Sequence, residues 1–370
     1  MKVCIVLNTL NFGCGPFQRF AILQELGHEV HVITLYDSTE NTINMIKSLG
    51  FDSGNYFVKG FGENSKFNSV LKAFTYLSRQ KYDVLHACHS MSQLICLILD
   101  ELSISKVYIG FEGRLFKFNR LIDMLLCEFT CRLSRRSICI SHACFKENKK
   151  RLSRCQRVVF YNGVDLTKFT RNKALSVDED GFLRFVVVSD KRREKNIEHV
   201  ILAFEKACSA LDCNSRIKPI LTIFGSDTDK LYSEEIKQMI SSSSCNDKIY
   251  DRGLVARSIV IDELLKSHVF ILASSNEGLS EALAQAMASC LVPICSNIEP
   301  NKELINDRVN GLLYPLGDIN ALSNLILEIV ENESLMSSLS LNARMTALEK
   351  LDIRKIVRSY EEFFKCLISQ

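Results

Sequence analysis

The stretch that decides the fold is Ser274-Ser275-Asn276-Glu277-Gly278-Leu279-Ser280-Glu281-Ala282-Leu283-Ala284-Gln285-Ala286-Met287. It follows the apolar run 268–273 (HVFILA), which predicts a buried parallel strand. The chain then turns at Glu277-Gly278, and the pattern predicts a helix from near Ser280. In an open α/β sheet, ligands bind at the carboxyl ends of the strands, and a helix N-terminus there favours an anion such as phosphate. The stretch therefore predicts an anion-binding loop next to the carboxylate of Glu277.

This stretch resembles the signature of the retaining nucleotide-sugar glycosyltransferases of family 4 (glycosyl transferases group 1). The family carries a Glu, seven residues and a second Glu within a Glu-Gly…Glu-Ala-Met frame, and here Gln285 replaces the second Glu. Segments 291–296, 299–305 and 310–318 resemble the strands and loops that follow in the family. The resemblance implies the α/β fold called GT-B, in which two doubly wound Rossmann-like domains face each other across a cleft.

The composition is that of an ordinary globular protein: 370 residues, 47% hydrophobic and 24% charged, with a net charge of +3. The 15 cysteines are irregularly spaced and lie mostly in apolar runs, so we expect free thiols and no disulfide framework. The first ten residues lack a signal-sequence pattern, and the longest apolar run is far below the roughly 20 residues of a membrane span. We expect a cytoplasmic protein, soluble or peripheral at the inner face of a membrane.

Strand and helix signals alternate along the whole chain, which predicts parallel sheets covered on both faces. We expect an N-terminal domain at 1–165, a nucleotide-sugar-binding domain at 166–352, and a last helix, 353–370, that packs back on the first domain. The polar segment 166–182 is the expected linker. The expected strands are 2–8, 29–35, 83–87, 106–110, 137–140 and 157–160 in the first half, and 185–189, 219–225, 248–250, 268–273, 291–296 and 311–314 in the second.

A basic turn, 190–196 (DKRREKN), follows the expected strand 185–189 and carries four cations. Cations at a strand end suit a pyrophosphate, although a solvated turn has the same composition. The resemblance implies that one Arg and one Lys of this turn bind the diphosphate. Lys195 matches the Lys and Arg192 the Arg, with Arg193 as a substitute. Asp190 stands where the family most often has its Arg.

The first domain offers a glycine loop and two histidines. Gly13 and Gly15 follow the first strand, and the resemblance implies that this loop approaches the donor phosphate; a simple tight turn is the alternative. The family often has His-x-His at the end of the strand 83–87, where the second His contacts the donor sugar. His86 and His89 are therefore catalytic candidates facing the cleft, with Cys88 in the second family position; core or loop histidines are the alternative. No spacing suggests a catalytic metal.

The two ends of the signature have different implied roles. In the family the first Glu, here Glu277, binds the transferred sugar and the second binds ribose hydroxyls. Gln285 retains a carbonyl acceptor, so ribose binding would weaken without being lost. The remaining donor-binding candidates are Gly278, Leu279 and Ser280 at the helix start and Leu254, in a loop that resembles the one whose backbone reads the base.

Residues 114–157 contain twelve Lys or Arg and three acidic residues, interleaved with apolar residues. The pattern predicts either a surface that contacts an anionic membrane or a helix pair with solvated charges. No nucleic-acid-binding motif accompanies the charge, so we expect no nucleic-acid partner.

Taken with the resemblance, these features predict a metal-independent, retaining glycosyltransferase without a cofactor. The donor would be a UDP- or GDP-type nucleotide sugar, and the acceptor a cell-surface glycan or a lipid-linked glycan. Two alternatives stay open. One is a catalytically impaired homologue that acts as a binding partner, and the other is a nucleotide-sugar epimerase of the same fold.

Overall fold

The structure is a computed structural model, and the chain divides into two compact units. Unit 1 comprises 1–163 and 353–370, and unit 2 comprises 164–352. The first boundary lies two residues before the expected one, and the second lies where the sequence places it. The residues described are 1–10, 15–48, 51–52, 54, 56–62, 65–88, 90–104, 108–112, 125, 129–130, 133–147, 156–171, 176–177, 180–211 and 216–369.

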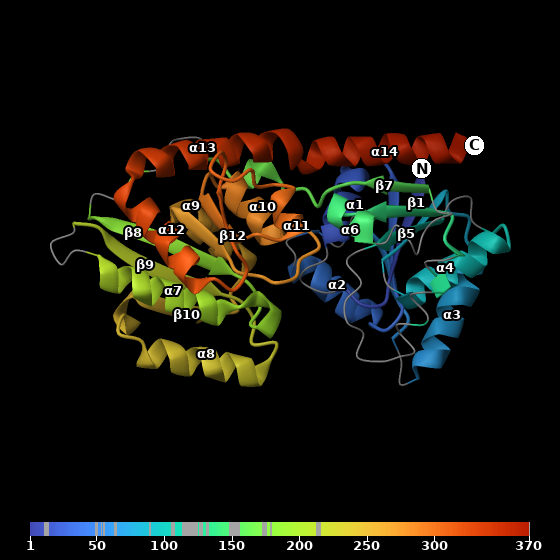
Figure 1. The fold of residues 1–370 in the computed structure, drawn as a ribbon. Helices are drawn as coiled ribbons and strands as arrows, with labels where there is room; N and C mark the ends of the chain where they lie inside the picture. The colour runs from blue at the N-terminus through green and yellow to red at the C-terminus, as the bar shows by residue number, and fades with distance from the viewer. Residues whose placement is uncertain are drawn as a thin grey trace. The chain divides into compact units, whose positions relative to one another are not determined.

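Unit 1 is built on a parallel sheet in the order β3-β2-β1-β4-β5-β6-β7 (Figure 1). Its strands are β1 Lys2–Leu7, β2 Glu29–Thr34, β3 Phe57–Gly60, β4 Val84–Ala87, β5 Tyr108–Glu112, β6 Arg136–Cys139 and β7 Gln156–Val159. Its helices are α1 Gly15–Glu25, α2 Thr39–Ser48, α3 Lys66–Ser78, α4 Ser90–Glu101, α6 His142–Glu147 and α14 Ile353–Ser369.

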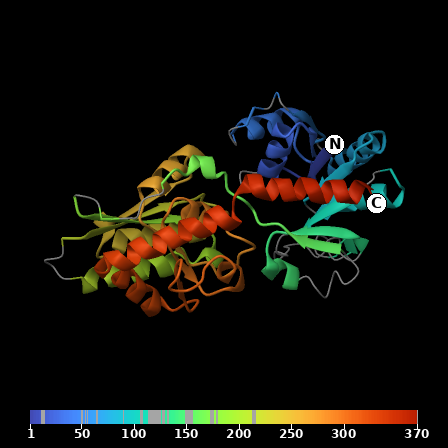
Figure 2. The same ribbon diagram turned by 90° about the horizontal axis from the view of Figure 1, so that it is seen from above.

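The central strands of unit 1 are buried on both faces, as continuous apolar runs in a parallel sheet require. One face packs against α1, α2 and α14, and the other against α3 and α4. The helix α14 buries one apolar stripe, which includes Val357, Tyr360 and Phe364, and it packs against α1. Figure 2 shows this helix lying along unit 1, so the last segment of the chain completes the first core.

Unit 2 is built on a second parallel sheet, in the order β10-β9-β8-β11-β12-β13. Its strands are β8 Phe182–Val188, β9 Lys218–Phe224, β10 Ile249–Gly253, β11 Val269–Leu272, β12 Val292–Ser296 and β13 Leu312–Tyr314. Its helices are α7 Ile197–Ala210, α8 Lys230–Ser242, α9 Arg257–Lys266, α10 Glu281–Ala288, α11 Glu299–Lys302, α12 Ile319–Glu331 and α13 Glu333–Lys350. Figure 1 shows α7, α8 and α12 on one face of this sheet and α9, α10 and α13 on the other.

Each expected strand has a counterpart in the structure, with ends shifted by up to three residues. The sequence missed β3, because its four residues (FVKG) form a partly exposed edge strand without a continuous apolar run. The expected linker 166–182 holds one short helical turn, Leu166–Lys168, and ends at the start of β8. Much of the basic segment 114–157 lies outside the described residues.

The strand order places a topological switch point in each unit. In unit 2 the chain leaves β8 towards β9 and leaves β11 in the opposite direction, towards β12. The loops after β8 and β11 therefore diverge at the carboxyl edge of neighbouring strands, where open α/β sheets bind their ligands. These two loops are the basic turn and the Glu277 loop.

Candidate functional site

An ion pair joins the two loops at the switch point of unit 2. Lys195 Nζ donates to Glu277 Oε1 over 2.7 Å. The side chains of the pair are only 13% and 11% exposed, so solvent screens their charges weakly. Burial, together with the nearby Glu277 carboxylate, raises the pKa of the Cys295 thiol, which lies at the end of β12. The structure thus brings together the two residues that the sequence predicts for the diphosphate and for the sugar.

The backbone of the two loops is also joined directly. Asn196 precedes α7 in the left-handed conformation, at φ 47°, and its Nδ2 donates to the Ala273 carbonyl over 2.9 Å. The Glu194 carbonyl accepts from the Ser275 N–H over 2.8 Å. Asn is one of the few side chains that tolerates this backbone conformation. The ion pair therefore rests on a fixed junction of two loops.

One cation of the basic turn has a structural role. Lys191 is almost fully buried, and its Nζ lies 2.8 Å from Asp227 and 2.9 Å from Asp251, in the loop after β9 and in β10. The Lys191 ammonium holds the pKa of Asp227 below its usual value. Asp190, the departure from the family pattern, accepts from the Ser226 hydroxyl over 2.5 Å. Both residues hold neighbouring loops of the sheet in place.

The two arginines of the turn point to different partners. Arg193 pairs with Glu235 of α8 at 2.6 Å, and its guanidinium lies over the Tyr232 ring. Arg193 is therefore not brought to the Lys195–Glu277 pair. Arg192 pairs with Glu194 of its own turn at 3.0 Å, and its Nε is buried without a hydrogen-bond partner among the described residues.

The helix after Glu277 begins where the sequence predicts. Ser280 caps α10 by accepting from the Leu283 N–H over 3.2 Å, which occupies its hydroxyl with the helix end. Leu279 is buried, so any contact it makes with a donor would come from its backbone. Gln285 is also buried, and its Nε2 donates to Glu281 over 2.9 Å.

In unit 1 the prediction for His86 is wrong, because its side chain does not face a cleft. It is completely buried between the sheet and the helices, with its ring centroid 5.1 Å from that of Phe20 and 6.4 Å from that of Tyr360. Burial, and the nearby Arg19 guanidinium, lower the pKa of His86 to about 3. A neutral, enclosed imidazole is a core residue.

The other unit 1 candidates are only partly covered. His89 and Gly13 lie outside the described residues, and Gly15 is the first residue of α1, in the loop after β1 at the switch point of this unit. Three of the described apolar side chains in the basic segment 114–157 are about half exposed: Leu125, Phe129 and Leu133. Among the described residues, no helix meets the length and hydropathy of a membrane span.

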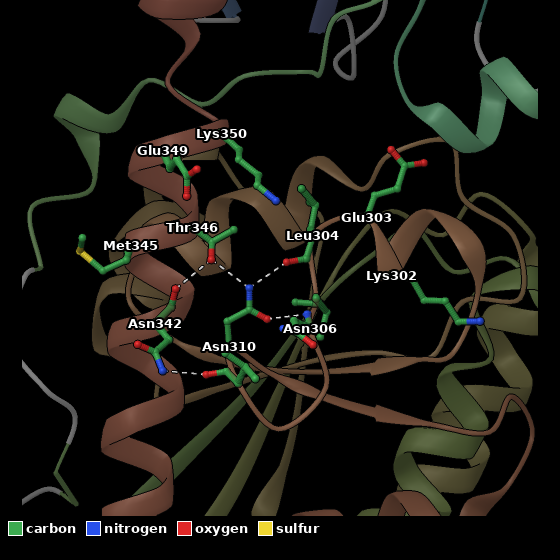
Figure 3. A pocket seen from close by; sticks show the side chains of 12 residues that line it. Lys302, Glu303, Leu304, Asn306, Asn310, Asn342, Met345, Thr346, Glu349 and Lys350 are labelled. Carbon is green, nitrogen blue, oxygen red and sulfur yellow. Dashed lines mark hydrogen bonds between the residues drawn. The ribbon is translucent and has the colours of Figure 1, made fainter.

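Unit 2 also has a pocket of about 480 Å³ between 302–310 and the C-terminal half of α13. Figure 3 shows the Asn310 amide at its centre, bonded to the Leu304 carbonyl, the Asn306 N–H and the Thr346 hydroxyl. The pocket contains none of the predicted site residues. Leu254, the predicted base contact, lies elsewhere in the unit, beside Gly253, and its side chain is largely exposed.

Several buried polar atoms near the ion pair have no hydrogen-bond partner among the described residues. Besides Arg192 Nε they are Ser274 Oγ and Asn276 Oδ1 of the Glu277 loop and Arg257 Nε of α9. Buried polar groups are normally paired, so a group of unpaired ones needs an explanation. Their position at the carboxyl edge of the sheet is consistent with a polar ligand there.

Comparison with known proteins gives a family match, sequence relatives and similar solved structures. Residues 169–346 match the family model described as glycosyl transferases group 1. A UDP-Gal:alpha-D-GlcNAc-diphosphoundecaprenol alpha-1,3-galactosyltransferase of Escherichia coli is 24% identical over 319 residues, 80% of this chain and 78% of the relative. Residues 169–346 thus form a glycosyl transferases group 1 domain, and the chain is a glycosyltransferase. The transferase is also similar to an N-acetyl-alpha-D-glucosaminyl L-malate synthase of Bacillus anthracis, at 22% identity over 92% of this chain and 90% of the relative.

Solved structures confirm the fold class of the transferase. The Anabaena protein Alr3699/HepE in complex with UDP superimposes with a TM-score of 0.80 at 15% identity, covering 99% of this chain and all of the other. Sucrose-phosphate synthase from Thermosynechococcus elongatus has the same TM-score at 14% identity and full coverage of both chains. The expected α/β GT-B fold, with two doubly wound parallel sheets, is confirmed.

The sequence missed several residues that shape the site of the transferase. Asn196 carries a weak signal, since Asn adopts the left-handed conformation more readily than most residues. Glu281 stands four residues before Gln285, the spacing at which helix side chains meet. Arg257 had no signal, because only the tertiary structure brings α9 beside the start of α10.

Proposed function

We propose that the transferase is a retaining, metal-independent enzyme of family 4 that uses a UDP- or GDP-type nucleotide sugar. The Lys195–Glu277 ion pair at the switch point carries this proposal. Lys195 and Arg192 would stabilise the negative charge that develops on the departing diphosphate, as preorganised cations do. Glu277 would accept hydrogen bonds from the sugar and orient it. The N-terminus of α10 adds a favourable dipole for the phosphates.

The names of similar proteins support the donor class. The Escherichia coli relative is named for UDP-Gal, and the Anabaena structure was solved with UDP and, in another crystal, with UDP-glucose. None of the predicted donor contacts in unit 2 discriminates between uracil and guanine, so both donors remain within the proposal.

For the acceptor we propose a lipid-linked glycan presented at the inner face of a membrane. The Escherichia coli relative is named for an acceptor on diphosphoundecaprenol. Leu125, Phe129 and Leu133 recur at intervals of four residues, each in helical conformation and each about half exposed, within the basic segment. Exposed apolar side chains with basic neighbours suit an anionic lipid surface.

The test is a donor panel. Purified protein is incubated with UDP- and GDP-sugars, with and without EDTA, and mass spectrometry follows the nucleotide and the sugar. We expect slow release of one nucleotide diphosphate, unchanged by EDTA, and faster release when a lipid-linked diphosphate sugar in anionic vesicles is added. Glu277→Ala should lose this turnover while remaining folded, and Glu235→Ala, on the surface of α8, should retain it.

Each alternative has its own outcome in the same assay. Nucleotide binding without turnover of any donor would identify an impaired homologue. A change in the sugar while the nucleotide stays attached would identify an epimerase. Turnover that survives in Glu277→Ala would remove this residue from the mechanism, and turnover that EDTA abolishes would refute metal independence.

A further inference from the structure

A three-residue cluster joins the start of α9 to the start of α10. The Oε1 atom of Glu281 accepts from Gln285 Nε2 over 2.9 Å and from Arg257 Nη2 over 2.8 Å. Glu281 is the first residue of α10, and Arg257 is the first residue of α9. Two donors on one oxygen fix the orientation of the carboxylate.

The members of this cluster differ in accessibility. Gln285 is 7% exposed, and its amide group is occupied in holding Glu281. The Glu281 side chain is 28% exposed, so it remains partly accessible to solvent. The Glu281 carboxylate thus lies one helical turn before Gln285, and the Gln285 amide holds it in position.

The position of the cluster fits one part of a nucleotide. Glu281 follows Glu277 by four residues, and Arg257 follows the exposed Leu254 by three. The cluster therefore lies where the loop after β10 meets the loop after β11, next to the ion pair assigned to the diphosphate. In addition, Arg257 Nε is a buried donor without a partner among the described residues, so the cluster contains an unsatisfied polar group.

A carboxylate here has a natural ligand in a vicinal diol. An ionised carboxylate accepts hydrogen bonds at both oxygens, with about four lone-pair positions in all. The ribose of a nucleotide offers two adjacent hydroxyl donors. We propose that Glu281 accepts the ribose hydroxyls of the donor, and that Arg257 and Gln285 are positioning residues for its carboxylate. This inference rests on the proposed function, since it assumes a nucleotide-sugar donor at this edge.

The test uses the full-length protein and nucleotides with and without the diol. Isothermal titration compares UDP with 2′,3′-dideoxy-UDP, and GDP with its dideoxy form. The wild type should bind the ribonucleotide at least about tenfold more tightly, since a hydrogen bond to a charged group is worth at least about 1.5 kcal/mol. Glu281→Ala should lose this preference and bind the dideoxy form within about threefold of wild type. Gln285→Ala should reduce the preference without abolishing it, and Glu235→Ala should leave it unchanged.

Opposite results would overturn the assignment. It fails if Glu281→Ala keeps the full ribose preference, or if Gln285→Ala alone abolishes it. Should the alanine variant not fold, Glu281→Gln provides the same comparison, because it keeps the side-chain length and removes the charge. Failure of the proposed donor class looks different, since the wild type would then bind neither UDP nor GDP, and failure of the proposed transfer reaction shows in the donor panel as binding without turnover. A wild type that binds both forms equally refutes only the role of Glu281.

Discussion

The most direct test of the site is to neutralise Glu277 and measure the affinity for UDP alone. If Lys195 serves the diphosphate, Glu277 competes with the nucleotide for the same ammonium, because Lys195 Nζ lies 2.7 Å from Glu277 Oε1. Glu277→Gln removes this competing charge and also removes repulsion of the phosphates. The variant should therefore bind UDP more tightly than wild type while losing sugar transfer, an opposite effect on binding and on turnover.

The magnitude follows from the burial of the pair. Both side chains are almost ninety per cent shielded from water, so their interaction keeps much of its strength. A charge-assisted hydrogen bond contributes about 1.5–3 kcal/mol, or roughly 10- to 100-fold in affinity. Gln keeps a neutral hydrogen bond to Lys195, so we expect a gain of about three- to tenfold. Lys195→Met should lose about 10- to 100-fold in UDP affinity, since it removes the cation itself.

The assay is isothermal titration with UDP, since a ligand without the sugar isolates the diphosphate from the sugar contacts of Glu277. Glu235→Gln is the matched control: it breaks the Arg193–Glu235 pair, which is as short but about half exposed and faces α8. Such surface pairs contribute less than about 1 kcal/mol, so UDP affinity should stay within about twofold. A fall in UDP affinity in Glu277→Gln, or no change in Lys195→Met, would refute the assignment of Lys195 to the diphosphate.

Two further predictions concern the scaffold. Burial lowers the pKa of His86 from 6.5 to about 3. Below pH 6.5 the unfolded chain therefore binds a proton at His86 that the folded chain does not bind, so the folded state becomes less stable as the pH falls. Between pH 7.5 and pH 5 the wild type should lose about 2 kcal/mol more in urea unfolding than His86→Gln; parallel pH profiles would contradict this. A Cβ on Gly225 would lie 1.9 Å from the Ser189 carbonyl oxygen, whereas one on Gly317 meets nothing within 4 Å. Gly225→Ala should therefore cost about 3 kcal/mol or more and Gly317→Ala only about 1 kcal/mol, and equal costs would show that the loop after β9 adjusts freely.

Much of the fold was predictable because buried parallel strands leave a strong pattern in the sequence. Runs such as 185–188 (FVVV) and 269–273 (VFILA) are apolar throughout, since both faces of the sheet are covered by helices. Glu277, Ser280 and the start of α10 were placed correctly, because strand ends, turns and helix caps are local features. An edge strand such as β3 lacks these constraints and was missed.

The direction of individual side chains was not predictable in the same way. Arg192 and Arg193 are neighbours in one turn, yet one pairs within the turn and the other with α8. The sequence predicts that His86 ends a strand and faces a cleft. In the structure its ring lies near Tyr360, from the far end of the chain, in the core of unit 1. Both outcomes depend on residues distant in sequence.

The sequence by itself determined the family, the two parallel sheets and the loop that carries Glu277, because periodicity and turn-forming residues depend only on neighbours in the sequence. Only the tertiary structure decided which charges meet: Lys195 with Glu277, the buried Lys191 with Asp227 and Asp251, and Arg257 with Glu281. The physical reason is that an ion pair depends on which loops lie side by side at a sheet edge. Strand order fixes that arrangement, and no local pattern in the chain encodes it.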